Sequence, residues 1–300
     1  MATASPIESQ SPSQLSVLNH RASSKFQAPG FLRLWHLASL DAPTVAVVWA
    51  LAFAHAANVQ LPRWLPVLLA LGTWAVYIGD RLLDVLFAAR RATSPLRERH
   101  HFHWKHRRLF LSIAATASAA ALAITLLYMP MAARQRNSVL GVAALAYFAG
   151  VHGFAANKRM RISSLLPKEL LVALIFTLAC TTPTIARIGH AWFQMLPAML
   201  CFTLLAWLNC HAIELWESSA PTQRTSIFRL GTLLAALCTA TAAALAILHL
   251  PREAVLSMAS ASSALLLAML DRRAPFLTPV TLRAAADFVL LTPAFLLWFR

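Results

Sequence analysis

The feature that most constrains this chain is a series of apolar runs, each about as long as a bilayer is thick. Nine such runs, separated by charged or proline-containing breaks, begin near residues 35, 64, 109, 138, 169, 192, 230, 254 and 283. A helix needs about 20 apolar residues to cross the hydrocarbon layer, where its backbone groups must be satisfied internally. The pattern therefore predicts an all-α, polytopic membrane protein with a bundle of nine transmembrane helices.

The composition agrees with this class, because 59% of the residues are hydrophobic and only 12% are charged, against about 25% in soluble proteins. Alanine-rich runs such as "SIAATASAAALAITLL" favour close helix packing, since small side chains let helices approach. The net charge of +15 comes from basic residues in the short connections. We therefore expect membrane lipids and phosphorylated substrates as partners, and no nucleic acid.

The two ends of the chain differ in character. Residues 1–30 are rich in Ser, Pro and Gln and lack a long apolar run, which predicts a disordered cytosolic tail without a cleaved leader, followed by one transmembrane domain over 31–300. Alternate connections hold nineteen Lys and Arg on the side of the tail and six on the other side. Positive charge is retained in the cytoplasm, so the N-terminus of this multi-pass protein is predicted to lie on the cytoplasmic side of the inner (cell) membrane.

Acidic residues are rare, with only eleven in 300 positions. Seven of them fall in or beside the cytoplasmic third of a predicted span: Asp41, Asp80, Asp84, Glu214, Glu217, Asp271 and Asp287. A charged group in the hydrocarbon costs about 2.5–3.5 kcal/mol, so such groups usually face a cavity, pair with each other or bind an ion. We expect them to converge at one membrane face.

Two of these helix ends carry paired carboxylates. Asp80 and Asp84 are four residues apart in "YIGDRLLD", and Glu214 and Glu217 are three apart in "HAIELWE", so each pair shares a helix face. Four carboxylates in one pocket would repel each other, and Mg²⁺ would resolve that conflict. The alternative is a pair of solvated helix ends bridged to neighbouring arginines.

The order of these elements resembles the UbiA superfamily of intramembrane prenyltransferases. "YIGDRLLD", a basic loop, "NKRMRISSLLPKELLVALIFTLACTTP" and a second acidic helix end follow one another as in that family. Its members have nine transmembrane helices and bind a prenyl diphosphate through Mg²⁺ held by acidic motifs on the second and sixth. The resemblance places Asp80 and Asp84 on the aspartates of an NxxxDxxxD motif whose asparagine is here Val76, and Glu214 and Glu217 on the second motif.

This resemblance implies a transferase that moves a prenyl group from a prenyl diphosphate to an aromatic or lipid-like acceptor, at the cytoplasmic side and with Mg²⁺ as cofactor. The four paired carboxylates would be the catalytic metal ligands. Residues that would bind the diphosphate are Lys158, Arg159, Lys168, Arg81 and Asn209. Two alternatives stay open: a catalytically silent protein of the same fold, indicated by Val76 and the two glutamates, and an ion-coupled secondary transporter.

Three further features have competing interpretations. The histidines at 100, 101, 103 and 106 in "LRERHHFHWKHRR" have the spacing of a transition-metal site, but the loop is also typical of a basic interfacial segment over the cytoplasmic mouth. Asp287 has a potential ion-pair partner four residues earlier in Arg283, and Asp41 is expected to pair locally or with a neighbouring helix. The four cysteines are interpreted as small core residues, because none forms a CxxC pair.

Overall fold

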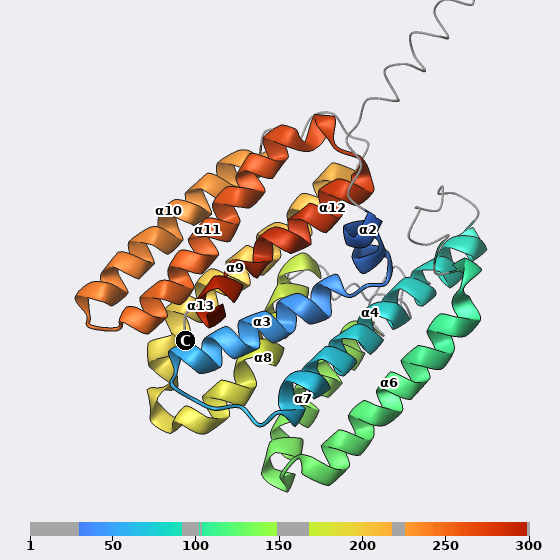
Figure 1. Cartoon of the computed structure of the whole chain (residues 1–300), viewed down its shortest axis with the longest axis horizontal. Helices are drawn as coiled ribbons and strands as arrows, with labels where there is room; N and C mark the ends of the chain where they lie inside the picture. The colour runs from blue at the N-terminus through green and yellow to red at the C-terminus, as the bar shows by residue number, and fades with distance from the viewer. Residues whose placement is uncertain (1–29, 92–101, 103, 149–167, 218–225, 299–300) are drawn as a thin grey trace, which may run out of the picture.

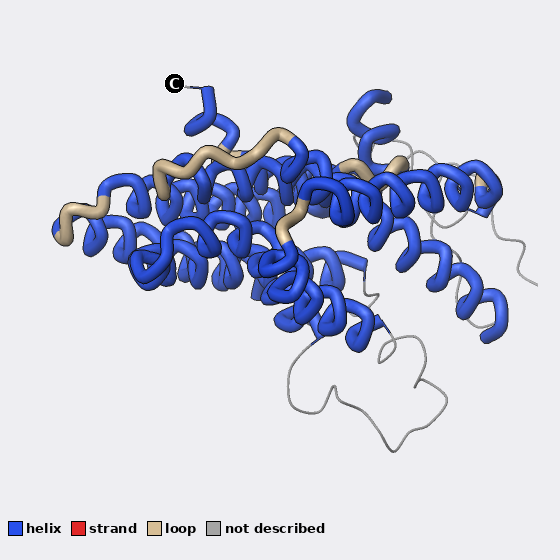
Figure 2. Tube along the Cα trace, turned by 90° about the horizontal axis from the view of Figure 1, so that it is seen from below, coloured by secondary structure: helices blue, strands red, loops and turns tan. Residues whose placement is uncertain are grey.

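The computed structural model describes residues 30–91, 102, 104–148, 168–217 and 226–298, and within them helices and loops account for the chain without any strand (Figure 1, Figure 2). The helices are α2 (Gly30–Leu37), α3 (Asp41–Ala56), α4 (Trp64–Arg91), α6 (Arg107–Tyr128), α7 (Met131–Phe148), α8 (Lys168–Ile188), α9 (Trp192–Glu217), α10 (Ser226–Ile247), α11 (Pro251–Arg273), α12 (Pro279–Phe288) and α13 (Ala294–Trp298), with short 3₁₀ segments η4 (Gly189–Ala191), η6 (Ala274–Phe276) and η7 (Val289–Leu291). The all-α prediction is confirmed. Apart from Gly30, the expected tail lies outside the described residues.

Five described stretches are long and apolar enough to cross a membrane: Trp64–Leu83, Arg107–Tyr128, Lys168–Glu217, Ile227–Ile247 and Pro251–Phe276. The bent pair α2 and α3 would add a sixth. The stretch of 50 residues reverses direction at η4, because Lys168 at its start contacts Glu214 near its end. The chain is thus a membrane protein by length and composition, whereas nine crossings stay a prediction, since α7 and α12 are too polar or too short for this criterion.

The first predicted span is not one continuous helix, because α2 and α3 meet at 87°. Ser39 lies between them in the left-handed region with φ of 59°. Its amide and that of Leu40 donate to the carbonyls of His36 and Trp35, which is the Schellman pattern that ends a helix. The apolar pattern gave no sign of this bend, since serine, unlike glycine, is not a usual residue at such a position.

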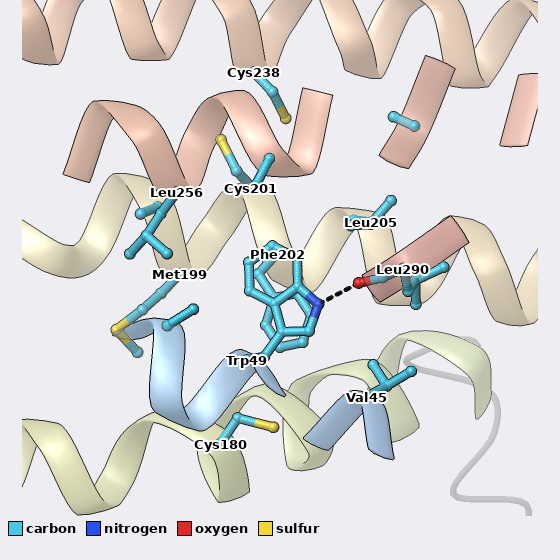
Figure 3. Packing of buried hydrophobic residues seen from close by; sticks show 14 of the residues in the cluster. Val45, Trp49, Cys180, Met199, Cys201, Phe202, Leu205, Cys238, Leu256 and Leu290 are labelled. Atoms are coloured by element: carbon cyan, nitrogen blue, oxygen red, sulfur yellow. Dashed lines mark hydrogen bonds between the residues drawn. The ribbon is translucent and has the colours of Figure 1, made fainter. Parts of the chain in front are cut away.

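The core lies where α3, α8, α9 and α11 meet and is built around two stacked aromatic rings (Figure 3). The centroids of Trp49 and Phe202 are 4.0 Å apart, and Phe53 packs against both. The indole Nε1 of Trp49 donates to the carbonyl of Leu290 at 2.9 Å. That carbonyl belongs to η7, so a break in the last helix supplies the acceptor that a buried indole requires.

Two helix pairs flank this core (Figure 1). On one side α10 and α11 pack so closely that a Cβ on Gly231 would lie 2.9 Å from both the carbonyl oxygen of Ala264 and the Cβ of Ala268. On the other side α6 packs on α4 through Phe110, Ile78 and neighbouring side chains. Cys180, Cys201 and Cys238 are buried and free, which confirms the interpretation of those three as core residues.

Candidate functional site

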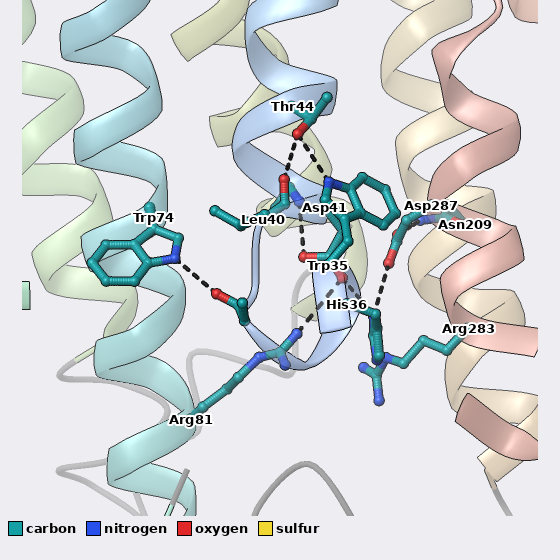
Figure 4. A network of polar contacts seen from close by, with 12 residues as sticks. Trp35, His36, Leu40, Asp41, Thr44, Trp74, Arg81, Asn209, Arg283 and Asp287 are labelled. Carbon is teal, nitrogen blue, oxygen red and sulfur yellow. Dashed lines mark hydrogen bonds and ion pairs between the residues drawn. The ribbon is translucent and has the colours of Figure 1, made fainter. Parts of the chain in front are cut away.

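A network of polar side chains joins α2, α3, α4, α9 and α12 at one end of the bundle (Figure 4). Nδ1 of His36 lies 2.6 Å from Oδ2 of Asp41 and 3.9 Å from Oδ2 of Asp287. Nη2 of Arg81 lies 3.9 Å from the same oxygen of Asp41, and the amide of Asn209 donates to Asp287. We call His36, Asp41 and Asp287 the buried triad, because one ligand atom from each lies within 4.8 Å of the others.

Local structure explains how these residues meet. The bend at Ser39 turns the last turn of α2 back toward the start of α3, so His36 faces Asp41 across a separation of only five residues. Asp41 is the first residue of α3, where a carboxylate is favoured by the helix dipole. Asp287 lies near the end of α12, and the packing of that helix against α2 and α3 completes the triad.

One oxygen of each triad carboxylate accepts a hydrogen bond from a group that is not a side chain of the triad. Oδ1 of Asp41 accepts the backbone N–H of Ala42 at 3.0 Å, and Oδ1 of Asp287 accepts Nδ2 of Asn209 at 3.0 Å. The two Oδ2 atoms are the ones that face Nδ1 of His36. The outer hydrogen bonds therefore fix how both carboxylates present their second oxygen to the centre of the triad.

The polar groups of the network are buried and only partly satisfied by one another. The side chains of Asp41 and Asp287 are 2% and 18% exposed, so both carboxylates are largely removed from water. Arg81 is close to Asp41, but 3.9 Å exceeds the length of a hydrogen bond. In the described part of the chain, Nη1 of Arg81 and Oδ1 of Asn209 are buried without a hydrogen-bond partner. Such atoms are uncommon in proteins and indicate an incomplete polar site.

The two glutamates of α9, which we call the α9 pair, lie at the same end of the bundle, and each contacts a cation. Oε1 of Glu214 accepts a hydrogen bond from Nζ of Lys168 at 2.9 Å, and this ammonium is 3.5 Å from Glu169. Glu217 is hydrogen-bonded to Nη1 of Arg283. Lys168 and Glu214 are about half exposed, whereas Arg283 and Glu217 are largely covered.

The acidic residues are linked at this end through further contacts. Asp271, near the end of α11, accepts the indole N–H of Trp216 at 2.7 Å and the backbone N–H of Phe228 at 3.1 Å. These bonds hold the ends of α9, α10 and α11 together. The described acids Asp41, Asp271 and Asp287, with the α9 pair, therefore gather at one end of the bundle, as the sequence led us to expect, although no membrane face is assigned by these contacts.

The predicted magnesium ligands are not gathered as one group in the described residues. Asp80 is partly buried on α4, but it does not join Glu214 and Glu217 in a group of three possible ligands, and the buried triad is the group that does form. Several of the predicted residues lie outside the described part, namely Lys158, Arg159 and the side chain of Asp84. The four-carboxylate site thus stays a prediction.

Other predicted partners are rearranged. Arg283 contacts Glu217, and Asp287 is instead bonded to Asn209, so the expected pair between Arg283 and Asp287 is replaced by two bonds to α9. Arg81 and Asn209, predicted to bind diphosphate, lie buried in the network. Each residue thus pairs with a partner on α9, 66 or 78 positions away in the sequence, rather than with the residue four positions away on its own helix.

Asp41 pairs as the sequence led us to expect, both locally with His36 and with Arg81 of a neighbouring helix. Sequence reasoning missed His36 as a site residue. The available signal was a histidine within an apolar run, five residues before an aspartate. Because a spacing of five does not place two side chains on one helix face, the pair becomes visible only once the bend is known.

Two other candidates do not adjoin the network. Of the histidine-rich loop, His106 is described and its Nδ1–H donates to the carbonyl of Phe102 at 3.0 Å, while positions 100, 101 and 103 lie outside the described residues. A pocket of about 270 Å³ lies at the opposite end of α3, lined by side chains that include Gln194, Arg252 and Glu253. None of the predicted site residues lines it.

Comparison with known proteins adds no further constraint: no protein-family model matches the chain, and neither a curated protein nor a solved structure matches it. The likeness to UbiA prenyltransferases therefore rests on the sequence motifs alone.

Proposed function

We propose that this chain is an intramembrane prenyltransferase of the UbiA type, with nine crossings, the N-terminus in the cytoplasm and the active site at the cytoplasmic end of the inner membrane. The observation that supports this most directly is the grouping of Lys168 with Glu214 where α8 begins and α9 ends. A cation and a carboxylate at one end of an otherwise apolar bundle match a substrate with a charged head and an apolar tail.

In this proposal the residues of the chain act mainly by position and charge. Lys168, about half exposed at the start of α8, attracts the diphosphate and compensates its charge as it leaves. The apolar side chains of the neighbouring helices exclude water from the allylic carbon as positive charge develops there. The acceptor, an aromatic or lipid-like molecule, then forms its bond to that carbon and releases a proton.

The proposed magnesium site includes two carboxylates that contact cationic side chains in the structure. Glu214 contacts Lys168 and Glu217 contacts Arg283, so each would exchange a cationic partner for the metal. Mg²⁺ commonly takes one or two carboxylates and completes its shell with phosphate oxygens and water, so the donor would have to bring part of the site. When bound, Mg²⁺ supplies neutralisation of the departing diphosphate.

The direct test uses the purified full-length chain in nanodiscs with labelled prenyl diphosphates of several chain lengths and a membrane lipid extract, with and without Mg²⁺. We expect a labelled lipid-soluble product and release of diphosphate that depend on Mg²⁺. The variant Glu214→Gln keeps size and hydrogen bonding but removes a charge, so it should weaken magnesium-dependent donor binding at least about tenfold. Asp271→Asn is the matched control, since Asp271 is occupied by Trp216 and Phe228.

The two ion pairs of α9 also favour a second candidate, a catalytically silent protein of the same fold. Glutamates fixed by Lys168 and Arg283 would serve to hold α8, α9 and α12 together. This candidate predicts no product with any donor, and donor binding in Glu214→Gln equal to that of the unchanged chain. Such a result, in protein with unchanged thermal unfolding, would replace the enzyme proposal.

A further inference from the structure

We propose that the buried triad of His36, Asp41 and Asp287 binds a first-row transition-metal dication, for which Zn²⁺ is the probe, at a site separate from the predicted magnesium carboxylates. One nitrogen and two carboxylate oxygens from three segments lie within 4.8 Å of one another. Mixed imidazole and carboxylate ligands suit zinc, iron or manganese better than magnesium, which prefers oxygen alone. This inference does not depend on prenyl transfer.

The surroundings of the triad resemble the outer shell of a metal site. Ligating carboxylates in such sites are usually oriented by hydrogen bonds from outside. Here the N–H of Ala42 holds Oδ1 of Asp41 and the amide of Asn209 holds Oδ1 of Asp287. Both Oδ2 atoms are left directed at Nδ1 of His36, so all three donor atoms are presented to one point.

Unpartnered buried atoms give a second, independent indication of a ligand. Asn209 is 7% exposed, and its amide reaches the triad through the bond to Asp287, yet its Oδ1 has no partner in the described part of the chain. Arg81 is 6% exposed, reaches Asp41 at 3.9 Å and leaves Nη1 without a partner there. A coordinated ion with bound water would provide the oxygens and hydrogens that such atoms lack.

The side chains around the triad would also compensate a divalent cation. Asp41 and Asp287 supply two carboxyl groups to one site, and the nearest positive charge, Nη2 of Arg81, is 3.9 Å from Oδ2 of Asp41. Groups that ligate a metal must be in their unprotonated forms, so metal binding would release to solvent any proton that the triad holds.

The test measures zinc bound to the full-length chain in nanodiscs of phosphatidylcholine, at pH 7.5 and with excess Mg²⁺, by elemental analysis after gel filtration. Because the histidine-rich loop also offers ligands, the measurement uses a parent protein in which His100, His101 and His103 are changed to Gln. We expect about one Zn²⁺ per chain in this parent. His36→Gln and Asp287→Asn should each weaken zinc binding at least about tenfold, whereas Asp271→Asn, which changes a carboxylate outside the triad, should not.

Two results would overturn the proposal: a parent that binds no Zn²⁺, or triad variants that bind it as tightly as the parent does. The first would mean that the triad does not bind this metal, and the second that the zinc is held elsewhere. Should His36→Gln fail to fold, the parent loaded with Co²⁺ decides the matter. X-ray absorption should then show one imidazole nitrogen among oxygen ligands, and a spectrum without imidazole would be as decisive against the proposal.

Discussion

The buried triad and the α9 pair lie at the same end of the bundle but in different surroundings. Glu214 and Glu217 each contact a full positive charge, and Glu214 is about half exposed. The carboxylates of Asp41 and Asp287 are largely buried and share one histidine and a distant guanidinium. Exposed carboxylates can be exchanged at little energetic cost, whereas buried ones are tied to folding or to a bound ion. Functional assays are therefore best interpreted with variants of Glu214, because Glu217, at 17%, is as covered as Asp287, at 18%.

The largest effect on stability is expected from removal of a triad carboxylate. Asp41→Ala removes the carboxylate that faces Arg81 and leaves His36 with Asp287 alone, at 3.9 Å, and loss of one member of a buried pair costs about 3–5 kcal/mol. The free energy of unfolding, measured by denaturant titration in mixed micelles, should fall by this amount. A loss below about 1 kcal/mol would show that the triad is not a buried charged site, and the contrast with the α9 pair would disappear.

A smaller effect is expected from the covered pair of Glu217 and Arg283, whose side chains are 17% and 20% exposed. A double-mutant cycle with Glu217→Gln and Arg283→Gln should give a coupling energy of about 1–3 kcal/mol, because the partners are partly desolvated and in direct contact. The measurement is the same unfolding titration on four proteins. If the effects of the two changes are additive, the coupling energy is zero, and Glu217 behaves as an exposed carboxylate despite its burial.

The smallest effect is expected from the pair of Lys168 and Glu214, which are 55% and 47% exposed. Their coupling energy in the cycle of Lys168→Gln and Glu214→Gln should be about 0.2–1 kcal/mol, since water and salt screen exposed ion pairs. Added NaCl should reduce it further. A coupling that exceeds that of Glu217 and Arg283 would reverse the proposed order, and Glu214 would then be a poor probe of donor binding.

The helices were predictable because apolar runs of bilayer length leave few alternatives. Seven of the nine predicted runs coincide with one helix each in the described part of the chain, whereas the first and the last are broken. The gathering of acids at one end followed from their position within those runs. The bend at Ser39 was missed because the apolar run continues through it, although Asp41 and Pro43 in the first turn of α3 are residues typical of a helix start. The pairing of Asp287 with Asn209 depends on how α12 packs on α9, which the spacing along either helix does not encode.

Because spacing along one helix does not encode how helices pack, the sequence pointed to the α9 pair and not to the buried triad. Sequence reasoning selected Glu214 and Glu217 because their spacing on one helix is visible in the sequence. The buried triad draws one residue each from α2, α3 and α12, and only the packing of these helices brings them together. Motif spacing favours sites built from one or two helices, so a site assembled from three segments is easily missed.

The hydrogen bond between Trp49 and the carbonyl of Leu290 has a consequence for the order of events during synthesis. Its two partners are 241 residues apart, so at about 5–20 residues per second the ribosome needs roughly 10–50 s to make the second after the first. Throughout that time the indole N–H of α3 must do without its final acceptor. This contact of α3 can therefore form only after the helices from α4 to α12 have been synthesised, so the packing of α3 against η7 follows the synthesis of all the helices between them.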